Sequence, residues 1–218
     1  MFDGIAGVYD FMNTVMTAGL HHRWRERAAE MAQIGPGARV LDVATGTGDL
    51  ALELARRAAP GGEVVGSDFS EAMLAKARAK SRGAVRFELG DALALPYADG
   101  SFDAATVGFG ARNFANVGAG LREMVRVVRP GGHVVVLDIT TPTRAPLSFF
   151  YRLWFDRIVP AAGRLLGFSA AYEYLPRSVR SFLPPQALAA EMAACGLADV
   201  RYVLTAGSII AIHAGTVR

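Results

Sequence analysis

The alternation of strand and helix patterns between residues 39 and 140 places the strongest constraint on the fold. Buried-strand patterns occur at 39–44, 63–68, 84–90, 102–109 and 133–139, and helical patterns occur at 48–59, 70–80 and 117–128. Ser70 is the expected N-cap of the second of these helices. Strands that alternate with helices of this length indicate βαβ units and a parallel sheet.

The chain after residue 184 is expected to complete this sheet. A helical pattern at 185–195 precedes two β-rich runs, at 200–207 and 208–217, that meet at a glycine. Two such strands fit a closing hairpin. The sequence therefore predicts an α/β fold with a mostly parallel seven-stranded sheet, helices on both faces and an antiparallel C-terminal hairpin.

Composition excludes several classes of protein. With 218 residues, 52% of them apolar, the chain can bury a full core without disulfides. The net charge of +3 comes from dispersed arginines, so nucleic acid is not an expected partner. A signal peptide and a membrane span are also not expected, which indicates a soluble cytoplasmic protein. Cys195 lies in an apolar helical pattern and is expected to be a buried core thiol.

A metal site is not expected either. Four histidines, His21, His22, His133 and His213, form no ligand-spaced cluster with cysteine or carboxylate side chains.

A glycine loop follows the first predicted strand. In VLDVATGTGDLA, Gly46, Gly48 and Ala51 satisfy the loose pattern G-x-G-x-x-G/A, which is weak when it occurs alone. Glycines let the backbone approach a ligand closely, and the N-terminus of the next helix offers unpaired N–H groups. The loop therefore predicts a ligand site at the end of this strand.

The carboxylates around this loop indicate which ligand it binds. Asp42 and Asp49 flank the loop, where they would repel a pyrophosphate and favour a cation. Asp68 ends the second strand about 20 residues beyond the loop, where a carboxylate can accept both hydroxyls of a ribose. Asp91 and Ala92 follow the third strand and can contact an adenine edge. A cationic ligand that carries adenosine is S-adenosylmethionine.

Several motifs in this order resemble known families. LDVATGTGD, GDALALP, SFDAATVGFG and RVVRPGGHVVVLD resemble the class I methyltransferase fold, which is Rossmann-like. More narrowly, YDFMN and HHRW, FGARN, RPGGHVVVLDIT and YEYLPRSVRSF are together similar to the UbiE/MenG-type quinone C-methyltransferases. These enzymes act on demethylmenaquinone and on the corresponding benzoquinol of ubiquinone synthesis. The resemblance covers nearly the whole chain.

The resemblance implies cofactor contacts at Thr47, Asp68, Asp91 and Ala92, in addition to those expected from Asp42, Gly46 and Gly48. Gly108 stands where some members have a Ser that contacts the cofactor. Chain length and the absence of internal repeats and Pro/Ser linkers predict one domain over 1–218, and the resemblance makes it a methyltransferase domain. Its expected parts are an N-terminal helical cap (1–35), a cofactor-binding core (36–140), a substrate or lid insertion (141–184), and a C-terminal helix with closing strands (185–218).

The expected catalytic groups follow the fourth strand. Open α/β sheets bind ligands beyond the carboxyl ends of their strands, so Arg112 and Asn113 in FGARNF are candidates for holding the quinol oxygens. Arg112 would stabilise an oxyanion or, through a water, take part in proton removal. His21 is a candidate base, although two adjacent histidines point about 100 degrees apart on a helix. Tyr9 and Asn13 are expected to touch ligand.

The insertion is the expected wall of the substrate site. Tyr172 and Tyr174 could frame the quinol ring. Residues 145–168 are rich in aromatic side chains and leucine and contain three arginines. Such a segment can be a core helix, a substrate lid or an interfacial helix. We expect transient contact with the inner face of the membrane, because a prenylated quinol resides in the bilayer.

The function predicted from these observations is methylation of the reduced ring of demethylmenaquinone by S-adenosylmethionine, which gives menaquinone. One alternative is C-methylation of the polyprenyl benzoquinol of ubiquinone synthesis. A more remote alternative is an NAD-dependent oxidoreductase, which the carboxylates beside the loop disfavour. A binding module without activity is a further alternative, and the oligomeric state stays open.

Overall fold

The computed structural model describes residue 17 and residues 19–142 and 176–218. These residues form a seven-stranded sheet with strand order β3-β2-β1-β4-β5-β7-β6. The strands are β1 (Arg39–Val43), β2 (Glu63–Asp68), β3 (Arg86–Leu89), β4 (Phe102–Gly108), β5 (Val128–Ile139), β6 (Leu197–Thr205) and β7 (Ile210–Val217). The helices are α3 (His21–Met31), α4 (Asp49–Ala58), α5 (Glu71–Ser81), the 3-10 helix η1 (Ala111–Asn113), α6 (Val117–Val127) and α10 (Pro185–Ala194).

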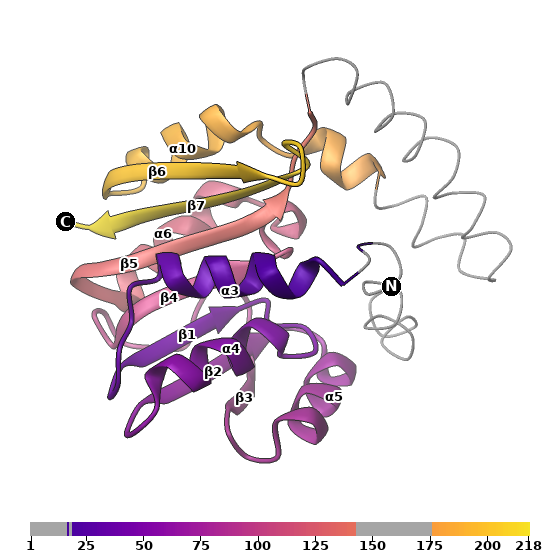
Figure 1. The fold of residues 1–218 in the computed structure, drawn as a ribbon. Coiled ribbons are helices and arrows are strands. Elements are labelled where there is room, and N and C mark those ends of the chain that lie inside the picture. The colour runs from indigo at the N-terminus through magenta and orange to yellow at the C-terminus, as the bar shows by residue number, and fades with distance from the viewer. Residues whose placement is uncertain (1–16, 18, 143–175) are drawn as a thin grey trace, which may run out of the picture.

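The sheet is parallel from β3 to β5 and antiparallel at its C-terminal end (Figure 1). β7 pairs antiparallel with both β5 and β6. The predicted α/β fold, with its closing hairpin, is therefore confirmed. The strand order reverses between β1 and β4, and ligands of open α/β sheets bind at such a point.

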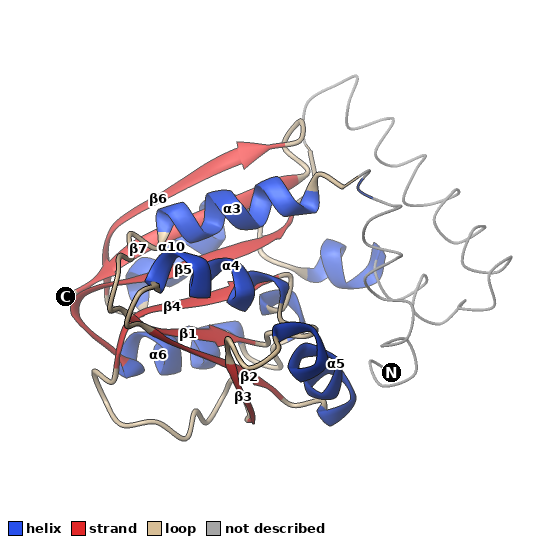
Figure 2. Cartoon of the chain, turned by 60° about the horizontal axis from the view of Figure 1, so that its bottom comes forward, coloured by secondary structure: helices blue, strands red, loops and turns tan. Residues whose placement is uncertain are grey.

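Alternate side chains of each strand face opposite layers of helices. Val40 and Ala104 belong to a core formed with α3, α4 and α5, whereas Leu41 and Ala105 belong to a core formed with α6 and α10. Figures 1 and 2 show α3 and α4 on one side of the sheet and α6 on the other. Burial on both faces explains why these strands read as continuous apolar runs.

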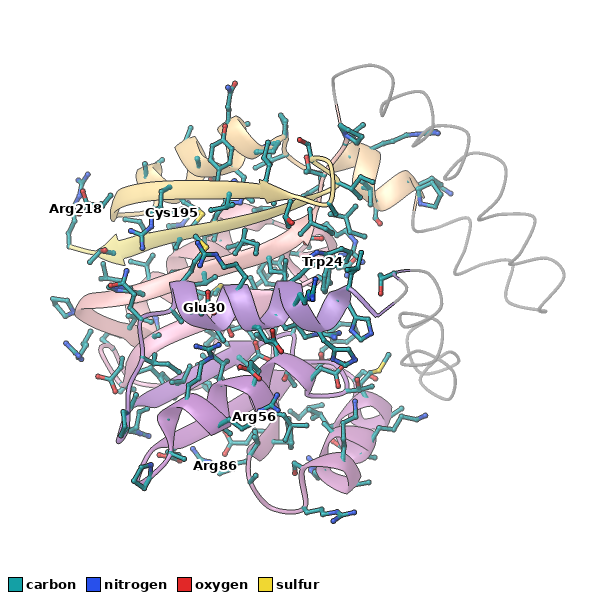
Figure 3. The ribbon with its side chains drawn as sticks, viewed as in Figure 1. Trp24, Glu30, Arg56, Arg86, Cys195 and Arg218 are labelled. Atoms are coloured by element: carbon teal, nitrogen blue, oxygen red, sulfur yellow. The ribbon has the colours of Figure 1, made fainter. Side chains whose placement is uncertain are left out.

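Local predictions agree closely with these elements. The Ser70 hydroxyl caps α5 by accepting a hydrogen bond from the Met73 amide. Trp24 is buried between α3 and the sheet (Figure 3), and Cys195 is a buried free thiol. Two strands begin well before their expected first residue, since β5 begins at Val128 rather than at His133 and β6 begins at Leu197 rather than at Val200. In β5 the extension is five residues. The register against β4 shifts between Phe102 and Ala104, which accommodates the early residues of the longer strand.

Two strained residues lie where the strand order reverses. Ala44, directly after β1, has φ 51°, and Phe109, directly after β4, has φ 60°. Gly110 packs against the first of these, since a Cβ at Gly110 would come within 2.6 Å of the Ala44 Cβ. Non-glycine residues with positive φ are uncommon and cluster at functional sites.

The predicted division of the chain into four parts stays a prediction, because most of its cap and insertion lies outside the described residues. None of the helices in the described part of the chain has the length and apolar composition that a bilayer span requires.

Candidate active site

A cavity of about 430 Å³ opens at the carboxyl ends of β1, β2, β3 and β4. Its lining comes from the ends of these four strands and the segments that directly follow them, together with Arg25 of α3 and Met73 of α5. The predicted cofactor residues Asp42, Gly46, Thr47, Asp68, Asp91 and Ala92 all line it. The structure thus brings together six side chains or backbone positions that the sequence analysis drew from three separate strands.

The two glycines of the loop have different roles. Gly46 has φ 57°, and a Cβ built there would meet nothing within 4 Å, so this residue faces open space at the cavity. Gly48 is not among the described residues of the lining. It has φ 82° and directly precedes α4, and its Cβ would come within 2.7 Å of the Phe87 ring. Gly48 is therefore required by backbone conformation and packing, whereas Gly46 leaves room for a ligand.

Asp42 supplies a buried carboxylate at the base of the cavity. Its two oxygens accept hydrogen bonds from the Thr45 and Thr106 hydroxyls, each at 2.6 Å. Burial nevertheless raises the pKa of Asp42 from 3.8 to about 6, because desolvation outweighs the two hydroxyl donors and the nearby charge of Arg25. This carboxylate can therefore change its charge just below neutral pH.

Asp68 joins the end of β2 to the glycine loop. Its Oδ2 accepts a hydrogen bond from the Gly46 amide at 2.8 Å, and its Oδ1 accepts one from the Ser70 amide at 2.9 Å. A carboxylate has about four lone-pair positions, so both oxygens can accept further hydrogen bonds. This arrangement fits the hydroxyls of a ribose.

The region beside Asp68 fits a flat heterocyclic base. Asp91 accepts a hydrogen bond from the Leu93 amide at 2.9 Å through Oδ1 and lines the cavity with Ala92. Phe69 and Met73 add apolar surface to the same lining, and Phe69 is 63% exposed. Phe69 was not predicted from the sequence. The signal that could have found it is its position directly after the carboxylate that ends β2.

Asp49 does not act as the unpaired negative charge that the sequence analysis assumed. Its Oδ1 lies 2.5 Å from the Lys80 Nζ, and its Oδ2 lies 3.1 Å from Arg25 Nη2. Lys80 also donates to the Thr47 hydroxyl at 3.1 Å. Two cations therefore balance the charge of Asp49. The prediction that Asp49 would repel a pyrophosphate is wrong for this reason. Asp42 and Asp68 carry the remaining preference for a cation.

His21 and His22 point in different directions, as expected for neighbours on a helix. His22 is exposed, whereas His21 is buried, and its Nδ1 forms a hydrogen bond with Arg25 Nη1. His21 is not among the described residues of the cavity lining, whereas Arg25 is. Arg25, which lies one turn further along α3, was not predicted from the sequence.

Arg112 and Asn113 lie in η1, beyond β4. Asn113 lines the cavity. Arg112 is not among the described lining residues, and its Nη1 donates to Asp138 Oδ1 and to the Phe109 carbonyl, each at 2.6 Å. The Arg112 amide donates to the other Asp138 oxygen at 3.1 Å. Arg112 therefore holds the loop after β4 against the end of β5.

The predicted substrate residues Tyr9, Asn13, Tyr172 and Tyr174 lie outside the described residues. Within the described ranges, no group of three or more His, Cys, Asp or Glu side chains has the arrangement that could hold a metal ion.

Comparison with known proteins adds the family. The model of the ubiE/COQ5 methyltransferase family matches residues 1–217. The chain belongs to this family. The expected resemblance is confirmed, and so is the assignment as an S-adenosylmethionine-dependent methyltransferase, whose ligand fits the carboxylates and apolar surface of the cavity.

Relatives and solved structures agree with the family. The chain is 50% identical to a demethylmenaquinone methyltransferase of Thermus thermophilus, over 99% of both chains. It is 40% identical to a ubiquinone/menaquinone biosynthesis C-methyltransferase UbiE of Geobacter sulfurreducens, over 99% of this chain and 86% of the relative. The fold is similar to that of an S-adenosylmethionine-dependent methyltransferase from Aquifex aeolicus, with TM-score 0.66, 17% identity and 89% of each chain covered.

Proposed function

We propose that the protein methylates a ring carbon of reduced demethylmenaquinone and so produces menaquinone. The observation that carries this proposal is the cavity where the strand order reverses, which places Asp68 and Asp91 in one lining. The chain that forms it is 50% identical, over 99% of its length, to a demethylmenaquinone methyltransferase.

The cavity residues have distinct parts in holding S-adenosylmethionine. Asp68 accepts hydrogen bonds from the ribose hydroxyls, and Asp91 with the Ala92 amide contacts the adenine edge. Thr47 and Gly46 line the cavity from the loop after β1, the strand that carries the buried Asp42. When bound, the cofactor supplies an electrophilic methyl group on a sulfonium centre, which Asp42 and Asp68 favour by their charge.

The residues after β4 are proposed to serve the substrate. Asn113 lines the cavity and can donate from its side-chain amide to a quinol oxygen. A quinol becomes nucleophilic at ring carbon when a neighbouring hydroxyl loses its proton, so a donor that stabilises the resulting oxyanion lowers the barrier. One well-placed donor typically contributes about 3 kcal/mol. Arg112 supports this site by holding the loop after β4 through its contacts with the Phe109 carbonyl and Asp138, and Asp138 balances its charge. Its part in stabilising the quinol oxyanion stays a proposal made from the sequence.

Several substrate contacts remain proposals made from the sequence. Tyr9 and Asn13 are proposed to touch the ligand, and Tyr172 and Tyr174 to frame the quinol ring. His21 remains a candidate base. Because His21 is bonded to Arg25, a variant such as His21→Gln should be judged by cofactor affinity as well as by turnover.

Contact with the membrane surface is a further part of this proposal. It rests on the aromatic and arginine-containing composition of residues 145–168 and on the solubility of a prenylated quinol in lipid. Sedimentation of the purified protein with anionic liposomes tests it. We expect co-sedimentation that increases when the prenylated quinol is present, and absence of binding in both conditions would contradict the proposal.

The alternatives to this function are a different quinol substrate and a different cofactor. The Geobacter relative carries a name that covers both quinone pathways, so the benzoquinol is the substrate to compare. The nicotinamide alternative is not favoured, because the chain matches a methyltransferase family over residues 1–217.

The decisive experiment offers both quinols to the purified protein with S-adenosylmethionine that carries a labelled methyl group. We expect label on the ring carbon of the naphthoquinol. Preference for the benzoquinol would move the protein to the ubiquinone pathway. Cofactor binding without label on either ring would mean that the substrate assignment is wrong.

A further inference from the structure

Arg25 is the only cationic side chain among the described residues that line the cavity. The same lining contains four carboxylates, those of Asp42, Asp49, Asp68 and Asp91. A single guanidinium among carboxylates marks the one place in this lining where a negatively charged part of a ligand meets a positive charge. S-adenosylmethionine has one such part, the carboxylate of its amino acid moiety.

The position of Arg25 relative to the sheet agrees with this match. Its Cζ lies 5.9 Å from the centre of the Phe109 ring, after β4, and its Nη2 pairs with Asp49, after β1. Asp91 lies after β3, which in the order β3-β2-β1-β4 is two strands further from β4 than β1 is. If Asp68 and Asp91 hold the adenosine, the amino acid end of the ligand lies on the side of Arg25.

The guanidinium is also held in place. The Arg25 side chain is 9% exposed. Its Nη1 forms a hydrogen bond with His21 Nδ1, and its Nη2 lies 3.1 Å from Asp49 Oδ2. An arginine has five N–H donors in a fixed fork, and these two partners leave others for a carboxylate. The cost of ordering the side chain is therefore largely met in the protein before the ligand binds.

We propose that Arg25 binds the carboxylate of the amino acid moiety of the methyl donor, and that His21 and Asp49 are positioning residues for its guanidinium. This inference rests on the proposed function, because it concerns the same cavity. It gives the helix α3 a part in cofactor recognition and gives His21 a role that requires no proton transfer.

Substitution of Arg25 by methionine is a clean test of this contact. Methionine keeps an unbranched side chain for packing against Phe109. Asp49 keeps Lys80 as its partner at 2.5 Å, so removal of the guanidinium does not leave a buried carboxylate without a cation. Arg27 of the same helix has a side chain that is 56% exposed and pairs with Glu30, so Arg27→Met is a matched control.

The experiment measures binding by isothermal titration calorimetry with two ligands, S-adenosylmethionine and its decarboxylated analogue. Arg25→Met should weaken binding of S-adenosylmethionine by about 10- to 100-fold, the effect of one charge-assisted contact, and should change binding of the analogue by less than about 3-fold. His21→Gln should produce a smaller loss with the same selectivity. Arg27→Met should match the unsubstituted protein with both ligands.

Two outcomes would overturn the assignment. Equal weakening of both ligands by Arg25→Met would mean that Arg25 only supports the loop, and unchanged affinity for S-adenosylmethionine would mean that the carboxylate lies elsewhere. Failure of the proposed function looks different: the unsubstituted protein would bind S-adenosylmethionine with the expected selectivity but label neither quinol.

Discussion

The guanidinium of Arg112 and the carboxylate of Asp138 form an ion pair of 2.6 Å in which the two side chains are only 8% and 2% exposed. Removal of one partner from a buried pair leaves the other charge uncompensated, which costs about 3–5 kcal/mol. Arg112→Met should therefore lower the free energy of unfolding by about that amount. Urea unfolding followed by circular dichroism measures it.

A second substitution separates the buried charge from lost packing. Asp138→Asn in the Arg112→Met background removes the orphaned charge and keeps an oxygen that can accept from the Ile139 amide. We expect the double variant to regain at least about 1 kcal/mol relative to Arg112→Met. A double variant that is less stable than the single one would show that the charge of Asp138 is satisfied by another group.

Cofactor binding and turnover should respond differently to substitutions at Asp68, in the cavity lining, and at Arg112, which holds the loop after β4. Asp68→Asn replaces the carboxylate that accepts hydrogen bonds from the Gly46 and Ser70 amides by a neutral amide. This change should weaken S-adenosylmethionine binding by about 10-fold or more. Arg112→Lys keeps a charge but loses the fork geometry, and it should lower kcat more than it changes this affinity. Calorimetry and single-turnover assays measure the two effects. Glu63→Gln, an exposed change at the far end of β2, is the control, and exchanged effects in the two variants would reverse the assigned roles.

The raised pKa of Asp42, about 6, predicts a pH dependence of stability. The folded protein holds this proton more tightly than the unfolded chain, whose carboxyl has a pKa near 3.8. The stability that protonation contributes is thus fully present below the unfolded pKa and is lost as the pH rises through about 6. The free energy of unfolding of Asp42→Asn, measured relative to that of the unsubstituted protein, should therefore increase by about 1 kcal/mol as the pH rises from about 5 to about 8.

Measuring Asp42→Asn and the unsubstituted protein at each pH cancels the contributions of other titrating groups to the difference in stability. Burial lowers the pKa of His213, which contributes an opposite change in the same range, but this histidine is present in both proteins. The affinity of the unsubstituted protein for S-adenosylmethionine should decrease as the pH is lowered through about 6, because a protonated Asp42 no longer attracts a cation. A pH-independent difference in stability between the two proteins would contradict the assignment of this pKa.

Gly48 should tolerate alanine less well than another glycine of similar conformation. Gly48 and Gly37 have φ 82° and 84°, but a Cβ at Gly48 would lie 2.7 Å from the Phe87 ring, whereas a Cβ at Gly37 meets nothing within 4 Å. Gly37→Ala should cost about 1–2 kcal/mol from backbone strain alone, and Gly48→Ala should cost more and weaken cofactor binding. Equal losses of stability would mean that Phe87 moves aside without cost.

Much of the fold follows from patterns that are local in the sequence. β2 covers the predicted residues 63–68, Ser70 caps α5, and the hairpin of β6 and β7 closes the sheet. These features depend on strand periodicity and on capping, which act within a few residues. Asp68 was predicted from its place at the end of the second strand pattern, and Gly46 from the glycine pattern of the loop after the first, and both signals are local in the sequence.

Long-range packing accounts for what those patterns could not reveal. Charge counted along the chain placed a free carboxylate at Asp49, yet α3 and α5 bring Arg25 and Lys80 to it. The pairing of Arg112 with Asp138 likewise joins the loop after β4 to the end of β5. Electrostatic balance depends on distances between segments that are remote in sequence, and these distances are set by how the helices and strands pack against one another.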